Sequence, residues 1–385
     1  MKELMKGTSG RWIWVSLLAM VIGFACWIAM LNLGLLGTTG LGNIFNWGML
    51  ICVFAFLVGF GAGGQLVASY AVLSGREGLA KFALPAQAFG LAGAVGAAVA
   101  VVIDLGQPFH IFSMLIHPNL TSPLVWDMVA LTAFIVVAFV GMLALARDWK
   151  SKRAWMIAGV VTAVALQLVE GLLFATQGSR AWWHSYVMPV DFLVVACVCG
   201  LALICVICAL SKEPGALEAG RSFAGLLFWA VIIHVVLALA EIALLAFEGG
   251  PGAEEALSFV FRYGALYALE LLLPLGAVIA LKVRLGEANS RKLTVCGVLV
   301  IIGMFCHRLM LLIPALSGVT LFTWLSNEPS PAWGYPISTG YLASAQQTFA
   351  LSQAYVPGVV ECLSLLLPLG LAALIAIVGY KLARS

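Results

Sequence analysis

The sequence predicts an all-α, polytopic integral membrane protein with about ten transmembrane helices. Composition is the first reason: 63% of the 385 residues are hydrophobic, 10% are charged, and the mean hydropathy is +1.08. Soluble domains carry about 25% charged residues, so a soluble core is excluded. The second reason is length: the apolar residues form ten stretches of about 20 residues or more, enough at 1.5 Å per residue to cross about 30 Å of hydrocarbon.

The ten predicted spans follow one another along the whole chain. They cover residues 12–36, 44–74, 79–103, 122–146, 153–177, 186–210, 223–248, 257–283, 292–316 and 355–382. The first stretch resembles a signal peptide at first sight, but the apolar part of a signal peptide has about 7–15 residues. This stretch has about 25 and no small-residue cleavage pattern, so we interpret it as a true span.

The third reason is the distribution of positive charge, which also predicts orientation. Seventeen of the twenty Lys and Arg residues lie in the N-terminal tail, in every second gap between spans, or at the C-terminus. Positively charged loops stay in the cytoplasm, so we expect both termini inside and five loops outside. The chain is therefore predicted in the cytoplasmic (inner) membrane, with its long loops 104–121 and 317–354 facing the periplasm or cell exterior.

Helix direction suggests how the spans are grouped. Spans two to five form one group and spans six to nine form a second, and the first span of each group starts at the outer face. This predicts a core of residues 44–316 made of two four-helix bundles, 44–177 and 186–316. Residues 1–43 form a tail and an additional helix, and 317–385 form an outer loop and a last helix. The glycine-rich run at 59–64 resembles a phosphate loop, but it lies within a span, where small residues let helices approach closely.

The membrane spans contain many ionisable residues, which are costly in a bilayer and usually face a bundle interior, a cavity or a partner. Asp104 and Asp127 cap the outer ends of spans three and four, and most other intramembrane acids are also close to the outer interface. A functional interpretation is a proton route coupled to a redox or transport event. The alternative is that Arg308 neutralises one or two acids and the others are hydrogen-bonded struts. The predicted proton-transfer residues are His234, Glu241, Tyr267, Glu270, His307, Arg308 and Glu361.

Two spacings support a shared polar path. Tyr263, Tyr267 and Glu270 follow an i, i+4, i+7 pattern, and His234 and Glu241 are also seven apart, so each set is expected on one helix face. Transmembrane haem is generally held by paired histidines, and only His234 and His307 lie inside spans, so at most one such pair exists. The nine cysteines all lie in apolar runs without a ligand loop. We expect neither haem, nor an iron–sulfur cluster, nor another metal site in this chain.

Three segments resemble the signature of the polysulfide-reductase (NrfD) family of membrane subunits. They are 104–108 (DLGQP), 117–119 (HPN) and 122–127 (SPLVWD), placed between spans three and four. The family pattern is D-L-G-[RK]-P, a short loop, then S-P and a tryptophan. This chain departs from it at Gln107, where a basic residue is common. Residues 46–64, 183–189 and the polar positions Glu241, Glu270, Arg308 and Glu361 are similar to further parts of the family, in its ten-helix branch that includes the hydrogenase-2 membrane subunit.

The resemblance implies a subunit without its own cofactor that exchanges electrons between the menaquinone or ubiquinone pool and a [4Fe–4S] ferredoxin-like partner on the outer face. That partner feeds a catalytic subunit, often a molybdopterin enzyme. Quinone chemistry moves two protons with two electrons and needs acid and base groups at the head of an apolar slot. The expected quinone-binding residues are Asn46, Asp104, His110, Trp126, Asp127, Glu170, His184 and Tyr186.

Two other functions fit the same helices. An ion-coupled secondary transporter would use the intramembrane acids and Arg308 to couple substrate movement to an ion gradient. It would also need interrupted helices, for which Pro274 and Pro368 are the candidate positions. A purely structural membrane anchor would need none of the acids.

Overall fold

The computed structural model describes residues 8–41, 45, 47–178, 180, 182–283, 286, 288–320, 337–338, 349–350 and 352–384. Ten helical spans in this part of the chain are long and apolar enough to cross a membrane, which confirms the predicted number. The first nine long helices are α1 (Thr8–Leu33), α3 (Met49–Leu73), α5 (Ala83–Asp104), α7 (Pro123–Ala146), α8 (Lys152–Ala175), α9 (Met188–Leu210), α10 (Ala216–Glu248), α12 (Gly264–Val283) and α13 (Ser290–Leu312). The tenth span consists of α14 (Val359–Ser364) and α15 (Leu366–Arg384).

Short elements connect these helices. They are α2 (Leu35–Thr38), α4 (Glu77–Ala80), the 3-10 helix η1 (Pro108–His110), α6 (Ile111–Ile116), α11 (Gly250–Arg262) and the 3-10 helix η3 (Pro314–Leu316). Two small antiparallel pairs join β1 (Ser317–Thr320) to β4 (Ser352–Ala354) and β2 (Ile337–Ser338) to β3 (Phe349–Ala350). The strands are confined to the segment after α13, so the membrane-spanning part of the described chain is helical.

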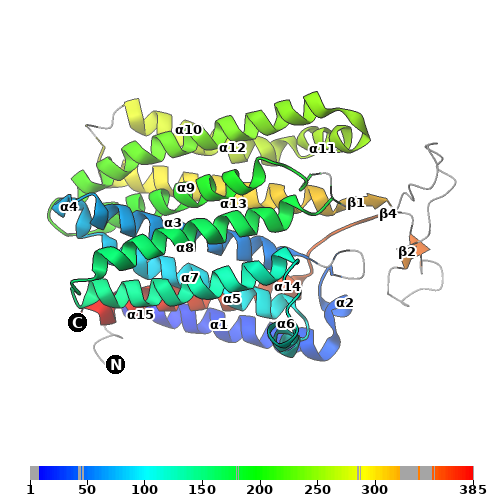
Figure 1. The fold of residues 1–385 in the computed structure, drawn as a ribbon, viewed down its shortest axis with the longest axis horizontal. Helices are drawn as coiled ribbons and strands as arrows, with labels where there is room; N and C mark the ends of the chain where they lie inside the picture. The colour runs from blue at the N-terminus through cyan, green and yellow to red at the C-terminus, as the bar shows by residue number, and fades with distance from the viewer. Residues whose placement is uncertain are drawn as a thin grey trace.

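Both ends of the chain lie at the same end of the bundle (Figure 1). We call it the terminal end; it also holds α4. The opposite end, which we call the loop end, holds α2, α6, α11, β1 and β4. An even number of crossings produces this arrangement, and the Lys and Arg distribution predicts that the terminal end is cytoplasmic.

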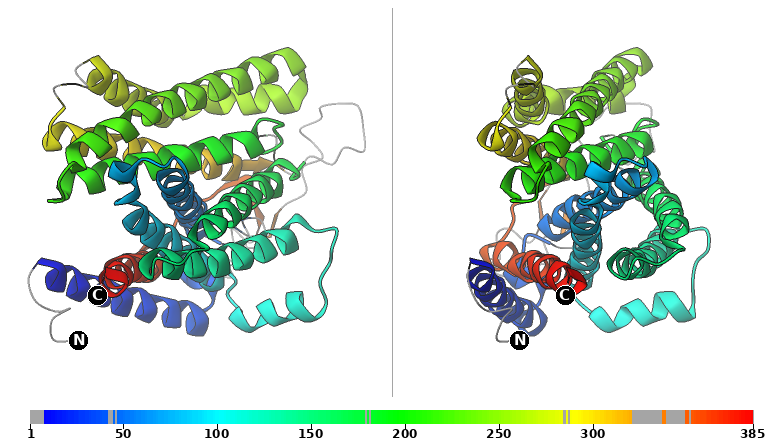
Figure 2. Two further views of the ribbon diagram at one scale, coloured as in Figure 1. Left: turned by 60° about the vertical axis from the view of Figure 1, so that its left-hand side comes forward. Right: turned by 90° about the vertical axis from the view of Figure 1, so that its left-hand side faces the viewer.

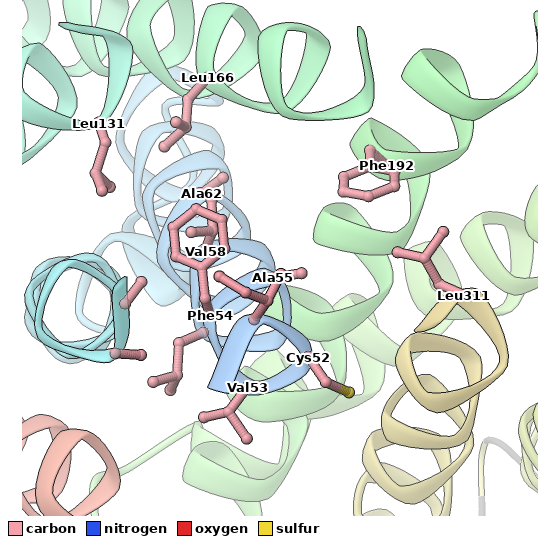
Figure 3. Close-up of a cluster of buried hydrophobic side chains, with 14 of the residues drawn as sticks. Cys52, Val53, Phe54, Ala55, Val58, Ala62, Leu131, Leu166, Phe192 and Leu311 are labelled. Atoms are coloured by element: carbon pink, nitrogen blue, oxygen red, sulfur yellow. The ribbon is translucent and has the colours of Figure 1, made fainter. Parts of the chain in front are cut away.

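The helix at the centre of the bundle is α3. It packs against α5, α8, α9 and α13, and 83% of its most apolar stretch is buried, more than in any other described span. Phe54, Val58 and Ala62 of α3 face Leu166 of α8 and Phe192 of α9 (Figure 3). The helices α1 and α15 lie side by side and reach the core through α5 (Figure 2).

Glycines let α3 approach its neighbours at backbone distance. A Cβ on Gly63 would lie 2.0 Å from the carbonyl oxygen of Ala196 in α9, and one on Gly64 would lie 2.8 Å from the carbonyl oxygen of Ala86 in α5. The glycine-rich run is therefore a packing surface, as predicted, and α9 contacts α3 directly. The boundaries proposed for the two four-helix bundles remain a prediction.

Two spans differ in detail from the predicted helices. The stretch 257–283 is interrupted at Tyr263, where the amphipathic α11 ends and α12 begins, so Tyr263 is not on the same helix as Tyr267 and Glu270. Pro274 lies inside an unbroken α12. The last span is interrupted at Leu365, three residues before Pro368, as expected because a proline ring clashes with the preceding turn.

We expect Gly63→Ala to lower the free energy of unfolding by about 2–3 kcal/mol, because the added methyl group overpacks a contact between two backbones. Thermal unfolding of the purified chain in mild detergent measures this. Gly225→Ala is the matched control, because a Cβ there meets no atom within 4 Å. Equal melting temperatures for the two variants would show that the contact between α3 and α9 is not tight.

Candidate functional site: two polar clusters at the loop end

Four ionisable side chains from four helices meet near the loop end, and we call them the histidine cluster. They are Asp191 of α9, His234 of α10, Glu270 of α12 and His307 of α13. His234 Nδ1 lies 2.9 Å from Asp191 Oδ1, and His307 Nδ1 lies 2.8 Å from Glu270 Oε1. His307 Nε2 is also 3.0 Å from Asp191 Oδ2, although the ring orientation does not complete a hydrogen bond there.

The cluster is buried and carries a small cavity. Asp191, Glu241, Tyr267, Glu270 and His307 line a space of about 30 Å³, closed by aromatic and aliphatic side chains. A volume of this order holds about one water molecule with several polar partners. Ser185 lies close enough to Glu241 to influence its carboxyl group. The four residues of the histidine cluster therefore form a row of close ion pairs in which imidazoles alternate with carboxylates.

The same ligand atoms are close enough to hold a metal ion. Asp191, His234 and His307 each offer one such atom, and these atoms lie within 4.8 Å of one another. The rings of His234 and His307 meet edge to face, with 5.0 Å between their centroids, and both contact the Asp191 carboxylate. They do not face each other across a space of the kind that a haem between two histidine ligands would occupy. Sequence reasoning did not anticipate that all three residues converge.

A second group, which we call the arginine cluster, lies beside the first: Asp127 of α7, Gln167 and Glu170 of α8, and Arg308 of α13. Arg308 is 1% exposed, and its guanidinium carbon lies 3.9 Å from the centre of the Phe192 ring. The guanidinium interacts electrostatically with Glu170, and Glu170 with Asp127. Gln167 Nε2 donates to Glu170 Oε2 at 3.3 Å.

The arginine cluster contains buried polar atoms without hydrogen-bond partners. Within the described residues these atoms are Arg308 Nε, Nη1 and Nη2, Asp127 Oδ1, Gln167 Oε1 and Glu170 Oε1. A buried donor or acceptor without a partner costs about 1–3 kcal/mol, and charged groups cost more. So many in one place indicate a site that is completed by a ligand or by water.

Two pairs of consecutive residues connect the clusters. Asp191 belongs to the histidine cluster, while the next residue, Phe192, stacks on the guanidinium. His307 likewise belongs to the histidine cluster and is followed by Arg308. Successive helical residues point about 100° apart, because a turn has 3.6 residues. One turn of α9 and one turn of α13 therefore serve both clusters.

The segment before α9 anchors the end of α13 that carries His307 and Arg308. Trp182 Nε1 donates to the Met310 carbonyl at 2.9 Å, and Trp183 Nε1 donates to the Leu311 carbonyl at 2.7 Å. These carbonyls lie in the last turn of α13, where no helical donor is available. Trp183 also packs on Trp47 and Phe174. The sequence comparison noted Trp183 as a family-like position, but it did not single out Trp182 and did not predict this role.

Glu361 lies in a different place from the other predicted proton-transfer residues. Its Oε1 accepts from the Met49 amide at 2.8 Å and from the Tyr355 hydroxyl, and its Oε2 accepts from the Gly40 amide at 3.1 Å and the Gly358 amide at 3.3 Å. Burial and the neighbouring carboxyl raise the pKa of Tyr355 well above its usual range, so the phenol keeps its proton. Glu361 thus caps α3 and ties it to α14.

The eight predicted quinone-binding residues do not all lie in one place. Asp127 and Glu170 interact electrostatically within the arginine cluster, and Asp104 interacts in the same way with Glu361. Four are exposed side chains of the loop end: His110, Trp126, His184 and Tyr186. Asn46 lies outside the described residues.

Buried amides form a third polar group that sequence reasoning missed. Gln87 of α5 donates to Gln65 of α3 at 2.6 Å, Gln65 donates to Ser69 at 3.0 Å, and Ser69 donates to the Met156 carbonyl in α8 at 2.9 Å. All three polar side chains are fully buried. Uncharged amides in an otherwise apolar run are the signal that could have revealed them. Their mutual pairing points to helix packing, not to a ligand site.

Comparisons with known proteins identify one protein family and several related chains. The family model described as polysulphide reductase, NrfD, matches residues 37–320. A provisionally named dimethyl sulfoxide reductase membrane subunit of Halobacterium salinarum is 27% identical over 97% of this chain and 91% of its own. The Hdr-like menaquinol oxidoreductase integral membrane subunit of Archaeoglobus fulgidus is 24% identical over 90% of this chain and 87% of its own. A selenate reductase subunit of Mesobacillus selenatarsenatis is 24% identical over 72% of this chain and 75% of its own.

We expect Glu361→Ala to lower the free energy of unfolding by about 3 kcal/mol, because three backbone amides lose their acceptor. Glu361→Gln keeps one acceptor oxygen and should lose less. Glu248→Ala, an exposed acid, is the control. Thermal unfolding measures all three. A Glu361→Ala variant of unchanged stability and reduced turnover would instead favour the proton-transfer role predicted from sequence.

Proposed function

The chain belongs to the polysulphide reductase NrfD family, and we propose that it is the quinone-reactive membrane subunit of a respiratory oxidoreductase complex. Two relatives are named as membrane subunits and a third as a reductase subunit, which supports a place in such a complex. The name of the Archaeoglobus relative supports a quinol as electron carrier. In this proposal electrons pass between the menaquinone or ubiquinone pool and a [4Fe–4S] partner at the loop end. That partner serves a separate catalytic subunit, for which a molybdopterin enzyme is our candidate.

The observation that supports quinone exchange most directly is the arginine cluster. Interconversion of a quinone and its quinol moves two electrons and two protons, so its site needs groups that accept and release protons next to an apolar wall. Asp127 and Glu170 are buried carboxyls, each with an oxygen that has no hydrogen-bond partner within the described chain. Phe192 provides an apolar wall beside the Arg308 guanidinium. These residues fit the head of a quinone.

Each residue then has a distinct task. The Arg308 guanidinium holds negative charge that develops on a bound oxygen, and its stacking on Phe192 fixes its direction. Asp127 and Glu170 exchange protons with the bound oxygens. Gln167, which donates to Glu170 Oε2, fixes one carboxylate oxygen and leaves the other available. Low-dielectric surroundings strengthen all of these interactions.

The site lies close to the lipid-facing surface. Asp127 is 5% exposed, whereas its neighbours Trp126 and Val129 on α7 are 50% and 48% exposed. An isoprenoid tail gains nothing from water and is stable against such apolar side chains. We therefore propose entry from the outer leaflet beside the first turns of α7.

The histidine cluster suits protons better than a quinone. Its cavity of about 30 Å³ has room for about one water molecule and not for a quinone ring. Protons would pass between the arginine cluster and Asp191, His307 and Glu270, and Glu241 and Tyr267 line the same cavity. The two consecutive-residue pairs on α9 and α13 support this connection, because they bring the clusters within one helical turn of each other.

We expect Asp127→Asn combined with Glu170→Gln to reduce quinol-linked turnover by about tenfold or more, because acid and base groups typically contribute at least that factor. Electron transfer from a quinol analogue to an artificial acceptor, measured on the intact purified complex, tests this. Glu248→Gln at the exposed end of α10 is the control. Normal turnover in the double variant, with normal complex yield, would refute the assignment of the quinone site.

Glu270→Gln should also slow turnover by about tenfold, since it interrupts the hydrogen-bonded chain to His307. The affinity for a quinone-site inhibitor should stay unchanged, because Glu270 is outside the arginine cluster. Inhibitor titration and turnover on the same preparation separate the two effects. If inhibitor affinity falls in parallel with turnover, the histidine cluster is part of the quinone site and not a separate proton route.

A further inference from the structure

A large cavity lies at the terminal end, far along the helices from the two polar clusters. Its volume is about 730 Å³, and the start of α5, the end of α9 and the last turns of α15 enclose it. We call it the terminal groove. None of the predicted quinone-binding or proton-transfer residues lines it, so the proposed function leaves it unexplained.

The terminal groove is amphipathic along its length. Its rim carries the polar side chains of Lys81, Ser211, Glu213, Tyr380 and Lys381, which lie before α5, after α9 and in the last turn of α15. Its walls are apolar and include Phe89, Ile207 and Ile377. Phe89 is six residues into α5 from Ala83, so the wall runs about 9 Å from the rim toward the middle of the membrane. A ligand that fits has one polar end and one apolar end.

The charge of the rim favours an anion. The lining contains two lysines, Lys81 and Lys381, and one carboxylate, Glu213. The first turn of α5, a helix of 22 residues, adds the partial positive charge of a helix N-terminus. Lys81 is exposed, whereas Lys381 is half-buried beside Tyr380. A phosphate can accept from both ammonium groups and from the tyrosine hydroxyl. An uncharged quinone head would use none of the lysine charge.

We propose that the terminal groove binds an anionic phospholipid of the leaflet at the terminal end, with its phosphate on Lys81 and Lys381 and an acyl chain along Phe89, Ile207 and Ile377. Basic pockets between transmembrane helices are a recognised form of such lipid sites. The lipid would join α15 to α5 and α9. The last helix otherwise packs mainly on α1 and α5. The proposal does not depend on the quinone function.

The test measures lipid bound to the intact complex. The protein is purified in mild detergent, and phosphatidylglycerol and phosphatidylcholine are titrated separately while bound lipid is counted by native mass spectrometry. We expect phosphatidylglycerol to bind more tightly than phosphatidylcholine. Lys81→Gln with Lys381→Gln should weaken phosphatidylglycerol binding by about thirtyfold, the size expected when two lysines act on one anionic headgroup.

The matched control is Lys150→Gln with Lys292→Gln, which removes the same charge from exposed positions at the same end but outside the groove. A second variant, Ala376→Trp, keeps both lysines and fills the groove from α15; it should also displace the lipid. Equal binding of the two lipids, or equal loss in the two lysine variants, would overturn the proposal. So would recovery of a quinone or of a partner helix from the groove.

Discussion

The direct backbone contact between α3 and α9 is the constraint on which the rest of the structure depends. A Cβ on Gly63 would lie 2.0 Å from the Ala196 carbonyl, and one on Gly200 would lie 2.2 Å from the Gly63 carbonyl. In a bilayer, water does not drive helices together, so packing at this distance supplies much of the attraction. With α9 held against α3, it also packs on α8 and α13, and Arg308 of α13 stacks on Phe192 and interacts electrostatically with Glu170 of α8.

Burial then decides how the polar groups behave. Water cannot satisfy a buried carboxyl or guanidinium, so each must find protein partners or remain unpaired at a cost. The buried amides around Gln65 and the carboxyl of Glu361 take the first course and bond to protein groups. In the arginine cluster, by contrast, several buried polar atoms have no hydrogen-bond partner among the described residues. This contrast separates groups that hold helices together from groups that we assign to chemistry.

The spans could be predicted from sequence because each depends on local composition and length. Convergence of Glu270 and His307 was partly predictable, since alternate helices run in opposite directions and both residues lie in the halves of their helices toward the loop end. Their contact with Asp191 was not, because it depends on helix rotation, which packing decides. Tyr263 was predicted to share a helix with Tyr267 and Glu270, whereas it lies at the break between α11 and α12, because an apolar run does not reveal such an interruption. Glu361 resembled the other intramembrane acids by position, and only its four contacts distinguish it.

The cap that Glu361 forms on α3 has a consequence for biosynthesis. Met49 and Glu361 are 312 positions apart, so the first buried helix of the core lacks this acceptor until the ribosome has reached Glu361. The loop end of α3 must therefore stay incomplete while the intervening helices insert. A chain that stops before Glu361 leaves the Met49 and Gly40 amides without this acceptor, even though helices α1 to α13 are all present.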